Sequence, residues 1–372
     1  MAVTLAWEQV HDSVGGFVEG LDYGVSMTTE HALIAGLIKG PTPRLTEIYR
    51  STNDGETWAK TADLNADNRP GCHRTVNLPD NIVVLPACDT APNTVTIYRS
   101  PDAGLTWPIA HTYQGADDPP FRDLFAYAGL GYDKNSILLA GRFQSGGVGG
   151  FKNFVRSTDK GQTWEFAGGI EQPAGGPIPT AMTNGANGNL LCGTTELETF
   201  WSSDYGATWN PSAALPTPPG FFGGQIEALT WMTPQIVLCA ASGNSSAETD
   251  WPYLYRSTNK GVSWTHIPKT DIASWPPHAD TRKIWEIKRL TKDLAIFLCD
   301  VGSNGNGNQT RMTIDGGLTW PILPTGMSFP ANNPARSFGN LIASAKQQLF
   351  VNSFNVEVSG AHRRIWKGTL TC

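Results

Sequence analysis

One eight-residue phrase recurs six times and sets narrow limits on how this chain can fold. Its pattern is Ser or Thr, any residue, Asp or Asn, any residue, Gly, any residue, Thr or Ser, and Trp; the copies begin at Ser51, Ser100, Ser157, Ser202, Ser257 and Thr313. Ser and Asp or Asn side chains hydrogen-bond to turn backbone, Gly readily adopts a positive φ, and Trp offers a large apolar surface. Each copy therefore predicts a strand, a tight turn and a returning strand.

The spacing of the phrase tryptophans predicts how many units the chain contains. Successive phrase tryptophans, from Trp58 to Trp320, lie 49, 57, 45, 55 and 56 residues apart. Trp7 lies 51 residues before Trp58, and 52 residues follow Trp320. We therefore expect residues 1–12 to supply one strand, and the C-terminal segment three strands, of a seventh unit. Such pairing would leave no exposed edge strand.

The six segments resemble Asp-boxes, also called BNR repeats, which occur in sialidases, xyloglucan-active glucanases, the sortilin ectodomain and a photosystem II assembly factor. The resemblance runs over the whole chain and implies a β-propeller, in which blades of four antiparallel strands surround a channel. Together with the spacing, it predicts an all-β, seven-bladed propeller with 3+1 closure by the N-terminal strand, and one domain over residues 1–372. It implies no particular reaction.

Composition narrows the range of partners. The charged fraction is 16% and the net charge is −6, without a basic stripe, so we expect no nucleic-acid partner. No apolar run approaches the ~20 residues that span a bilayer, so no membrane insertion is expected. The N-terminus has no signal-peptide pattern. We nevertheless expect an extracellular protein, or one on a virion or cell surface; the sequence leaves the oligomeric state open.

The cysteines predict buried side chains and no cofactor. Cys88, Cys192, Cys239 and Cys299 fall in the apolar second strands of different blades, and sheets ~10 Å apart are too distant for bridges. Cys72 and Cys88 are equidistant in sequence from a turn near Pro79. They could therefore form a cross-strand disulfide, or each could remain a free thiol; the sequence leaves both alternatives open. The spacing of Cys and His predicts no zinc site.

Candidate ligand-binding residues lie in the segments between blades, at the end of the ring opposite the repeated turns. These segments differ from one another, as segments that carry function do. Four arginines stand before innermost strands: Arg74, Arg122, Arg282 and Arg336. Guanidinium groups bind carboxylates through two hydrogen bonds, which favours an acidic sugar such as a sialic or uronic acid. Alternatively, these arginines pair locally with Asp123, Asp280 or backbone carbonyls.

Aromatic residues in the same segments, Trp251 and Trp275, are candidates for stacking on sugar rings. The arginines also resemble the layout of sialidases, which use an arginine triad, a tyrosine nucleophile with a glutamate, and an aspartate acid/base. The candidate catalytic residues are Tyr127, Asp123, Glu227, Glu286, His73 and His278. The two histidines would serve as bases in a polysaccharide lyase.

The chain departs from both enzyme families that it resembles. It lacks the Arg-Ile-Pro phrase of sialidases, and its predicted seven blades exceed their six. Residues 7–20 are similar to the start of xyloglucan-active glucanases, but those enzymes place two aspartates between two propellers and only one propeller is predicted here. The sequence thus predicts a carbohydrate-recognising propeller that is either a glycoside hydrolase, a lyase, a lectin or adhesin, or a protein-binding assembly module.

Overall fold

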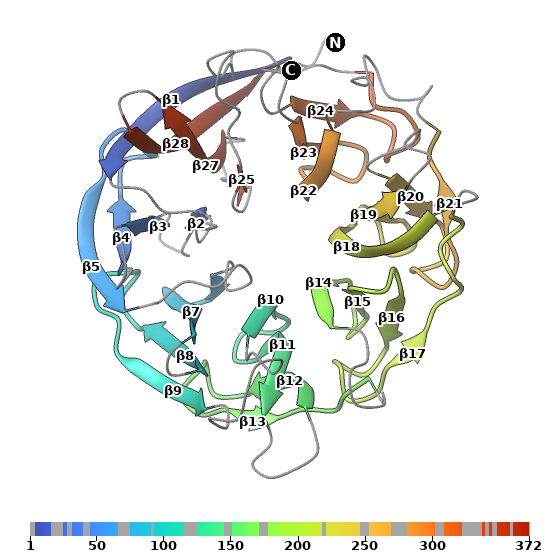
Figure 1. Ribbon diagram of the computed structural model, residues 1–372, viewed down its shortest axis with the longest axis horizontal. Helices are drawn as coiled ribbons and strands as arrows, with labels where there is room; N and C mark the ends of the chain where they lie inside the picture. Colours follow the sequence, from blue (N-terminus) through green and yellow to red (C-terminus); the bar gives the residue numbers. More distant parts are fainter. Residues whose placement is uncertain are drawn as a thin grey trace.

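The chain folds as an all-β, seven-bladed propeller, as the sequence predicted (Figure 1). The computed structural model describes residues 4–15, 25–27, 32–39, 45–65, 75–90, 93–114, 125–144, 151–170, 178–217, 221–245, 253–268, 281–301, 309–321, 337–338, 342–343, 348–357 and 360–371. Within those ranges, we find no helix with the length and apolar character that crossing a bilayer requires.

The blades follow one another along the chain, and we number them in that order. Blade one is β2 (Val25–Met27), β3 (Leu33–Lys39), β4 (Leu45–Ser51) and β5 (Ala59–Asn65). Blade two is β6 (Val76–Leu78), β7 (Ile82–Thr90), β8 (Asn93–Ser100) and β9 (Ile109–Gln114). Blade three is β10 (Phe125–Gly131), β11 (Ile137–Gln144), β12 (Phe151–Ser157) and β13 (Glu165–Phe166).

The next three blades repeat this antiparallel order. Blade four is β14 (Pro179–Asn184), β15 (Leu190–Thr194), β16 (Thr199–Ser202) and β17 (Asn210–Pro211). Blade five is β18 (Phe221–Trp231), β19 (Val237–Ser245), β20 (Tyr253–Ser257) and β21 (Thr265–His266). Blade six, over the described residues, is β22 (Thr281–Arg289), β23 (Ala295–Val301) and β24 (Gln309–Thr313).

Blade seven combines strands from both ends of the described chain. It contains β25 (Ser337–Phe338), β26 (Ile342–Ala343), β27 (Gln348–Glu357), β28 (Gly360–Thr371) and β1 (Thr4–Gly15). β1 pairs antiparallel with β28, which pairs with β27 (Figure 1). Trp7 lies over Gly368, where a Cβ would come 2.9 Å from the indole ring. Arg364 Nε donates to Asp12 Oδ2 at 3.1 Å across the same strand pair.

The repeated phrase forms a compact hydrogen-bonded turn, of which blade two is an example. The Ser100 hydroxyl accepts from the Gly104 N–H at 2.7 Å and donates to Asp102 Oδ1 at 2.9 Å. Asp102 in turn accepts from the backbone N–H of Thr106 at 2.9 Å and from its hydroxyl at 2.6 Å. Gly104 has a φ of 86°, and the Trp107 indole donates to its carbonyl at 3.1 Å. The turn carboxylate is therefore held by the turn itself.

Each turn glycine also packs against the second strand of the preceding blade. A Cβ on Gly104 of blade two would lie 2.3 Å from Cδ1 of Ile34 in blade one. The equivalent close contacts around the ring are Gly55 with Phe350, Gly161 with Val84, Gly206 with Leu138, Gly261 with Leu191, and Gly317 with Leu238. The phrase thus shapes a turn within one blade and joins that blade to its neighbour.

The second strands form the buried core, where the sequence predicted continuous apolar runs. Leu138 and Leu191, for example, are 0% exposed. Cys192 and Cys239 are free and buried, as expected, and burial raises the pKa of both thiols. Cys72 and the side chain of Cys88 lie outside the described residues, so their pairing stays a prediction.

Four of the turn carboxylates have lowered pKa values. Burial by itself would raise the pKa of Asp102, but hydrogen bonds from Thr106 and Ser100 outweigh it and hold the pKa below its ordinary value of 3.8. The same balance lowers the pKa of Asp159, Asp204 and Asp315. In blades one and five, an asparagine occupies this position and makes the corresponding bonds, as Asn53 does to Thr57.

These lowered pKa values predict a specific acid sensitivity. A carboxyl group whose pKa is lower in the folded state contributes stability above its unfolded pKa, and this contribution disappears as the pH falls through the folded pKa. Replacing all four residues, Asp102→Asn, Asp159→Asn, Asp204→Asn and Asp315→Asn, should reduce the stability lost between about pH 5 and about pH 2. Thermal unfolding of both proteins across that range measures it. An equal loss in the variant would contradict this explanation.

Candidate functional site

Strand direction gives the ring two ends. Because neighbouring strands in a blade are antiparallel, the repeated turns and the turns between first and second strands share one end, which we call the turn end. The connections from one blade to the next lie at the other end, which we call the crossover end. The innermost strands run between the two and line the channel (Figure 1).

A β-bulge occurs at the same place in the innermost strands of blades three to six. At this place one residue per blade is left out of the pairing: Tyr127, Thr180, Glu227 and Trp285. Blades five and six each have a second bulge, at Gly223 and Arg282. Each bulge adjoins the same repeat position of the second strand: Ala140, Gly193, Ala240 and Leu298. A bulge redirects a side chain and is frequent next to functional sites. Two of the sequence candidates, Tyr127 and Glu227, are therefore at equivalent bulges.

Glu227 is a buried carboxylate held by side chains of its own blade. Its side chain accepts at Oε1 from Gln225 Nε2 at 2.8 Å and from the Ser242 hydroxyl. Gln225 and Ser242 are paired across β18 and β19, on the crossover side of the bulge. Glu227 is only 8% exposed. These two hydrogen bonds hold Oε1 of Glu227 in one position on β18, the strand of blade five that lines the channel.

Two further contacts connect the inner strands around Glu227. The Thr180 hydroxyl donates to the Ile226 carbonyl at 2.5 Å, which joins the bulge of blade four to that of blade five. Glu286 follows the bulge of blade six directly and is half-buried on β22, which lies next to β18. The sequence candidates Glu227 and Glu286 are therefore on adjacent inner strands.

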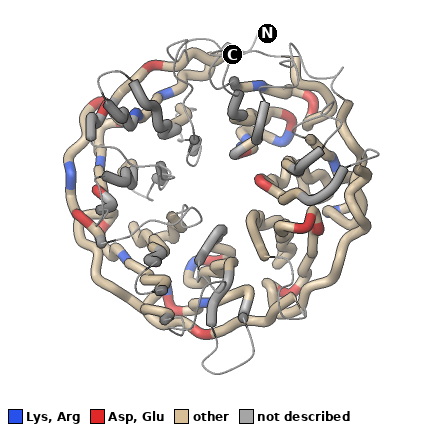
Figure 2. The backbone as a smooth tube through the Cα atoms, viewed as in Figure 1, with Lys and Arg blue, Asp and Glu red and all other residues tan. Residues whose placement is uncertain are grey.

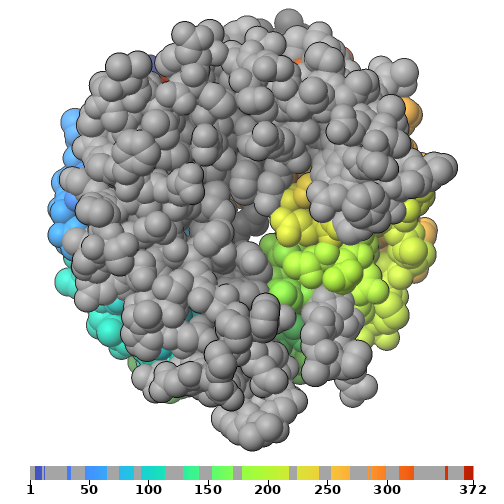
Figure 3. Space-filling model, in the orientation of Figure 1, coloured from blue at the N-terminus to red at the C-terminus, as the bar shows by residue number. Residues whose placement is uncertain are grey.

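Among the described residues, charged positions are distributed around the ring and are not concentrated in one blade (Figure 2). Acidic and basic positions are spread around the ring, including strands that border the channel (Figure 2). On the face seen in Figure 3, the described atoms nearest the channel are green to yellow, the colours of blades four and five. The described part of the channel wall on this face therefore comes mainly from blades four and five (Figure 3).

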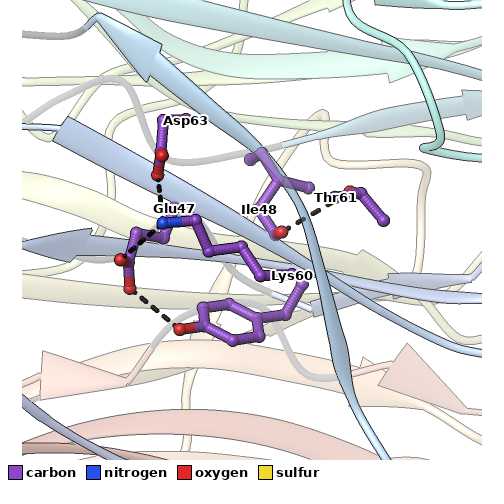
Figure 4. A network of polar contacts seen from close by, with 6 residues as sticks. Glu47, Ile48, Lys60, Thr61 and Asp63 are labelled. Atoms are coloured by element: carbon purple, nitrogen blue, oxygen red, sulfur yellow. Dashed lines mark hydrogen bonds and ion pairs between the residues drawn. The ribbon is translucent and has the colours of Figure 1, made fainter.

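A second buried carboxylate, Glu47, belongs to a hydrogen-bonded network on the outer strands of blade one. It lies on the third strand of blade one and accepts from Lys60 at 3.0 Å and from the Tyr49 hydroxyl at 2.9 Å (Figure 4). Lys60 also pairs with Asp63 at 2.7 Å. A hydrogen bond to Asp63 raises the pKa of Lys60 most, and a hydrogen bond to Glu47 raises it further. Because β4 and β5 are the outer strands of the blade, this network stabilises the blade away from the channel.

Most of the other sequence candidates lie outside the described residues: Arg74, Arg122, Arg336, Asp123, His73, His278, Trp251 and Trp275. For Arg282 and Tyr127 the structure describes the strand but not the side chain, and Arg282 lies at a second bulge of β22. The convergence of the four arginines thus stays a prediction. Among the described side chains, no group of three or more His, Cys, Asp or Glu could hold a metal ion.

Sequence reasoning missed Thr180, Gln225 and Ser242. The alternating pattern of a strand gives no sign of an extra residue, so the bulges that position these groups were not predicted. The repeated phrase does contain a usable signal, because its first Ser pairs with a fixed position of the second strand, as Ser202 does with Leu190. If each second strand is numbered from the residue that pairs with the turn Ser, equivalent positions in the second and innermost strands of different blades can be aligned.

About half of the chain is similar in sequence to proteins that are named xyloglucanases. A xyloglucanase from Paenibacillus sp. is 29% identical over 213 residues, which are 49% of this chain and 20% of that protein. A xyloglucanase from Acetivibrio thermocellus is 27% identical over 210 residues, 49% of this chain and 24% of that protein. The matches thus span a quarter or less of these relatives. No protein-family model matches the chain.

Solved structures show the same fold. YCF48 from Cyanidioschyzon merolae superposes with a TM-score of 0.58 at 11% identity, covering 97% of this chain and 98% of that one. The GH74 xyloglucanase from Xanthomonas campestris superposes with a TM-score of 0.56 at 16% identity, covering 94% of this chain and 59% of that one. At such identities the likeness concerns the fold alone.

The hydrogen bonds to Glu227 predict how substitutions there affect stability. Glu227→Gln keeps an acceptor oxygen for Gln225 and Ser242, so the free energy of unfolding should change by no more than roughly 1 kcal/mol. Glu227→Leu leaves both donors without that acceptor and should cost about 1–3 kcal/mol. Urea unfolding of the two variants distinguishes them, and equal losses would contradict the role assigned to these bonds.

Proposed function

We propose that the chain is a carbohydrate-recognising propeller of glycoside-hydrolase-like type, and that it binds a polysaccharide segment where β18 and β22 line the channel. The observation that carries the proposal is the sequence similarity to xyloglucanases over about half of the chain. Glu227 and Glu286 provide carboxylates on adjacent inner strands, and the bulges in blades four to six provide the local geometry that such sites use.

The two carboxyl groups suggest a hydrolytic mechanism. Most glycoside hydrolases use one carboxylic acid to protonate the leaving oxygen and a second carboxylate to activate water or to attack the sugar directly. We assign these two roles to Glu227 and Glu286 as a pair. Gln225 and Ser242 hold one oxygen of Glu227 in place, which restricts the carboxylate to one orientation.

The finer specificity remains part of the proposal. We propose that Arg74, Arg122, Arg282 and Arg336 give the site its preference for acidic saccharides, because guanidinium groups match the geometry of carboxylates. The six repeated turns are proposed to be Asp-boxes. One propeller domain over residues 1–372, acting outside the cell or on a virion or cell surface, completes this proposal.

A glycan panel followed by product analysis tests the proposed function. The panel includes xyloglucan, arabinan, polygalacturonate and polysialic acid. We expect the wild-type protein to bind at least one of them, with stronger binding to the acidic members, and to release reducing ends. Glu227→Gln should bind the same glycan but lose at least about 100-fold in hydrolysis, since general acid–base groups contribute about that much or more. Glu56→Gln, an exposed residue of the blade-one turn, is the matched control.

The other possible results of this experiment distinguish hydrolysis from the alternative functions. Binding without any product would retain carbohydrate recognition and replace hydrolysis by a lectin or adhesin role. Unsaturated uronate products would indicate a lyase and would direct attention to His73 and His278. Full turnover by Glu227→Gln would remove that residue from the mechanism, and absence of binding to the whole panel would overturn the proposed function.

A further inference from the structure

Glu227 is the residue at the bulge of β18, so regular ladder pairing does not fix its backbone. The residues on either side, Ile226 and Ala228, pair with Ala241 and Ala240 of β19, and Glu227 is left out between them. A bulge interrupts the ladder at the extra residue and bends the strand there. The place from which the Glu227 carboxylate projects therefore depends on further contacts to this part of β18.

Thr180 of blade four makes one of these contacts. β14 and β18 lie side by side, and Thr180 is itself the bulge residue of β14 (Figure 1). Its hydroxyl donates to the Ile226 carbonyl at 2.5 Å and, over a longer distance of 3.2 Å, to the Gly193 carbonyl of its own blade. The Ile226 carbonyl belongs to the peptide unit that ends at the Glu227 nitrogen, and this unit is planar. A hydrogen bond to that oxygen therefore also restrains the backbone of Glu227.

Gly193 makes a second contact because it has no side chain. It is buried on β15, and a Cβ there would come 2.4 Å from Cβ and 2.3 Å from Cγ2 of Ile226. Since the Ile226 Cβ is bonded directly to the backbone, rotation of the side chain cannot relieve the first of these contacts. The equivalent positions of blades three, five and six carry side chains: Ala140, Ala240 and Leu298. Gly193 thus lets β18 approach blade four directly before Glu227.

The backbone and the carboxylate of Glu227 are held by different blades. Gln225 and Ser242 of blade five hold Oε1 of the carboxylate. Thr180 and Gly193 of blade four hold the peptide unit that precedes Glu227. Such placement matters for a reacting group, because a displacement of about 1 Å can reduce a rate about 100-fold. The two sets of contacts together restrict the carboxylate to one place at the channel.

We propose that Thr180 and Gly193 are positioning residues for Glu227, so that blade four fixes the place of a carboxylate that blade five carries. The inference rests on the proposed function where it concerns hydrolysis, and on the contacts alone where it concerns the position of Glu227. Both residues act through Glu227 and not on the saccharide. Their substitution should therefore lower kcat and leave KM nearly unchanged.

Kinetics on the four glycans of the panel test the catalytic part of the proposal. Thr180→Val keeps the shape of the side chain but removes the donor, and Gly193→Ala pushes β18 away from blade four. Each should lower kcat about ten- to 100-fold at nearly constant KM. Thr180→Ser keeps the donor and should retain most of the wild-type kcat.

Two matched controls separate positioning from a general effect on the fold. Thr183→Val removes another half-buried hydroxyl of β14, one that makes no hydrogen bond to β18 among the described residues. Gly169→Ala adds a Cβ that would meet nothing closer than 3.9 Å. Both controls should have the kcat of the wild type. If Gly193→Ala does not fold, as circular dichroism would show, Thr180→Val and Thr180→Ser decide the question.

Carbon-13 NMR tests the position of Glu227 independently of turnover. In protein labelled at the glutamate carboxyl carbons, the Glu227 signal is identified by its loss in Glu227→Gln. At constant pH this signal should shift in Thr180→Val and in Gly193→Ala, and should keep its place in Thr180→Ser and in both controls.

The two measurements together decide the proposal. An unchanged Glu227 signal in Thr180→Val and Gly193→Ala would overturn it, whether or not the wild type is active. Unchanged kcat in both variants of an active protein would also overturn it, as would a raised KM with constant kcat, which would assign Thr180 to saccharide binding. If the wild type hydrolyses none of the glycans, the hydrolytic function fails, and a shifted signal still supports positioning of Glu227 by blade four.

Discussion

The close packing of a turn glycine against the preceding blade is the contact on which the ring depends. Six glycines of the repeated phrase approach a second-strand side chain so closely that a Cβ would lie 3.0 Å or less from it. Since each contact joins one blade to the next, the position of every blade follows from that of its neighbour. Such nearest-neighbour contacts are how repeat proteins accumulate stability.

The junction between blades six and seven is made in a different way. The residue of blade six that corresponds to Ile34 is Ile296, and it belongs to an apolar cluster with Leu5, Trp7 and Leu349 of blade seven. The outer strand of blade seven comes from the N-terminal segment, so this junction uses Trp7 where other junctions use a turn glycine. The pairing of β1 with β28 therefore contributes both to a sheet and to the contact between blades.

The sequence predicted the architecture well because its signal is local and repeated. The phrase contains its own turn chemistry, and the tryptophan spacing gives the number of blades. The candidate site was predicted only in part. Glu227 and Glu286 were selected as acids on inner strands, but the bulges, and with them Thr180 and Ser242, depend on pairing registers that strand alternation does not reveal. The four arginines and two of the tryptophans lie in segments whose placement the structure does not describe.

Departures from the repeat were visible in the sequence, but their consequences were not. Trp201 in place of an arginine can be read directly from "FWSSDYG" beside "YRSTNDG". What this exchange does depends on Trp231 and Lys260, which approach Trp201 only when blades four and five pack together. Regular positions thus specify the ring, whereas the surroundings of an irregular position depend on how two blades pack together.

A double-mutant cycle on Gly104 and Ile34 tests the central contact most directly. Ile34→Val alone should cost about 0.5–1.5 kcal/mol, and Gly104→Ala alone should cost more than the roughly 1–3 kcal/mol of a strained backbone. Since valine lacks the Cδ1 that a new Cβ would meet, the double variant should lose about 1 kcal/mol less than the sum of the two. A matched cycle of Gly104→Ala with Ile226→Val, in blade five, should be additive. Additivity in both cycles would contradict the account.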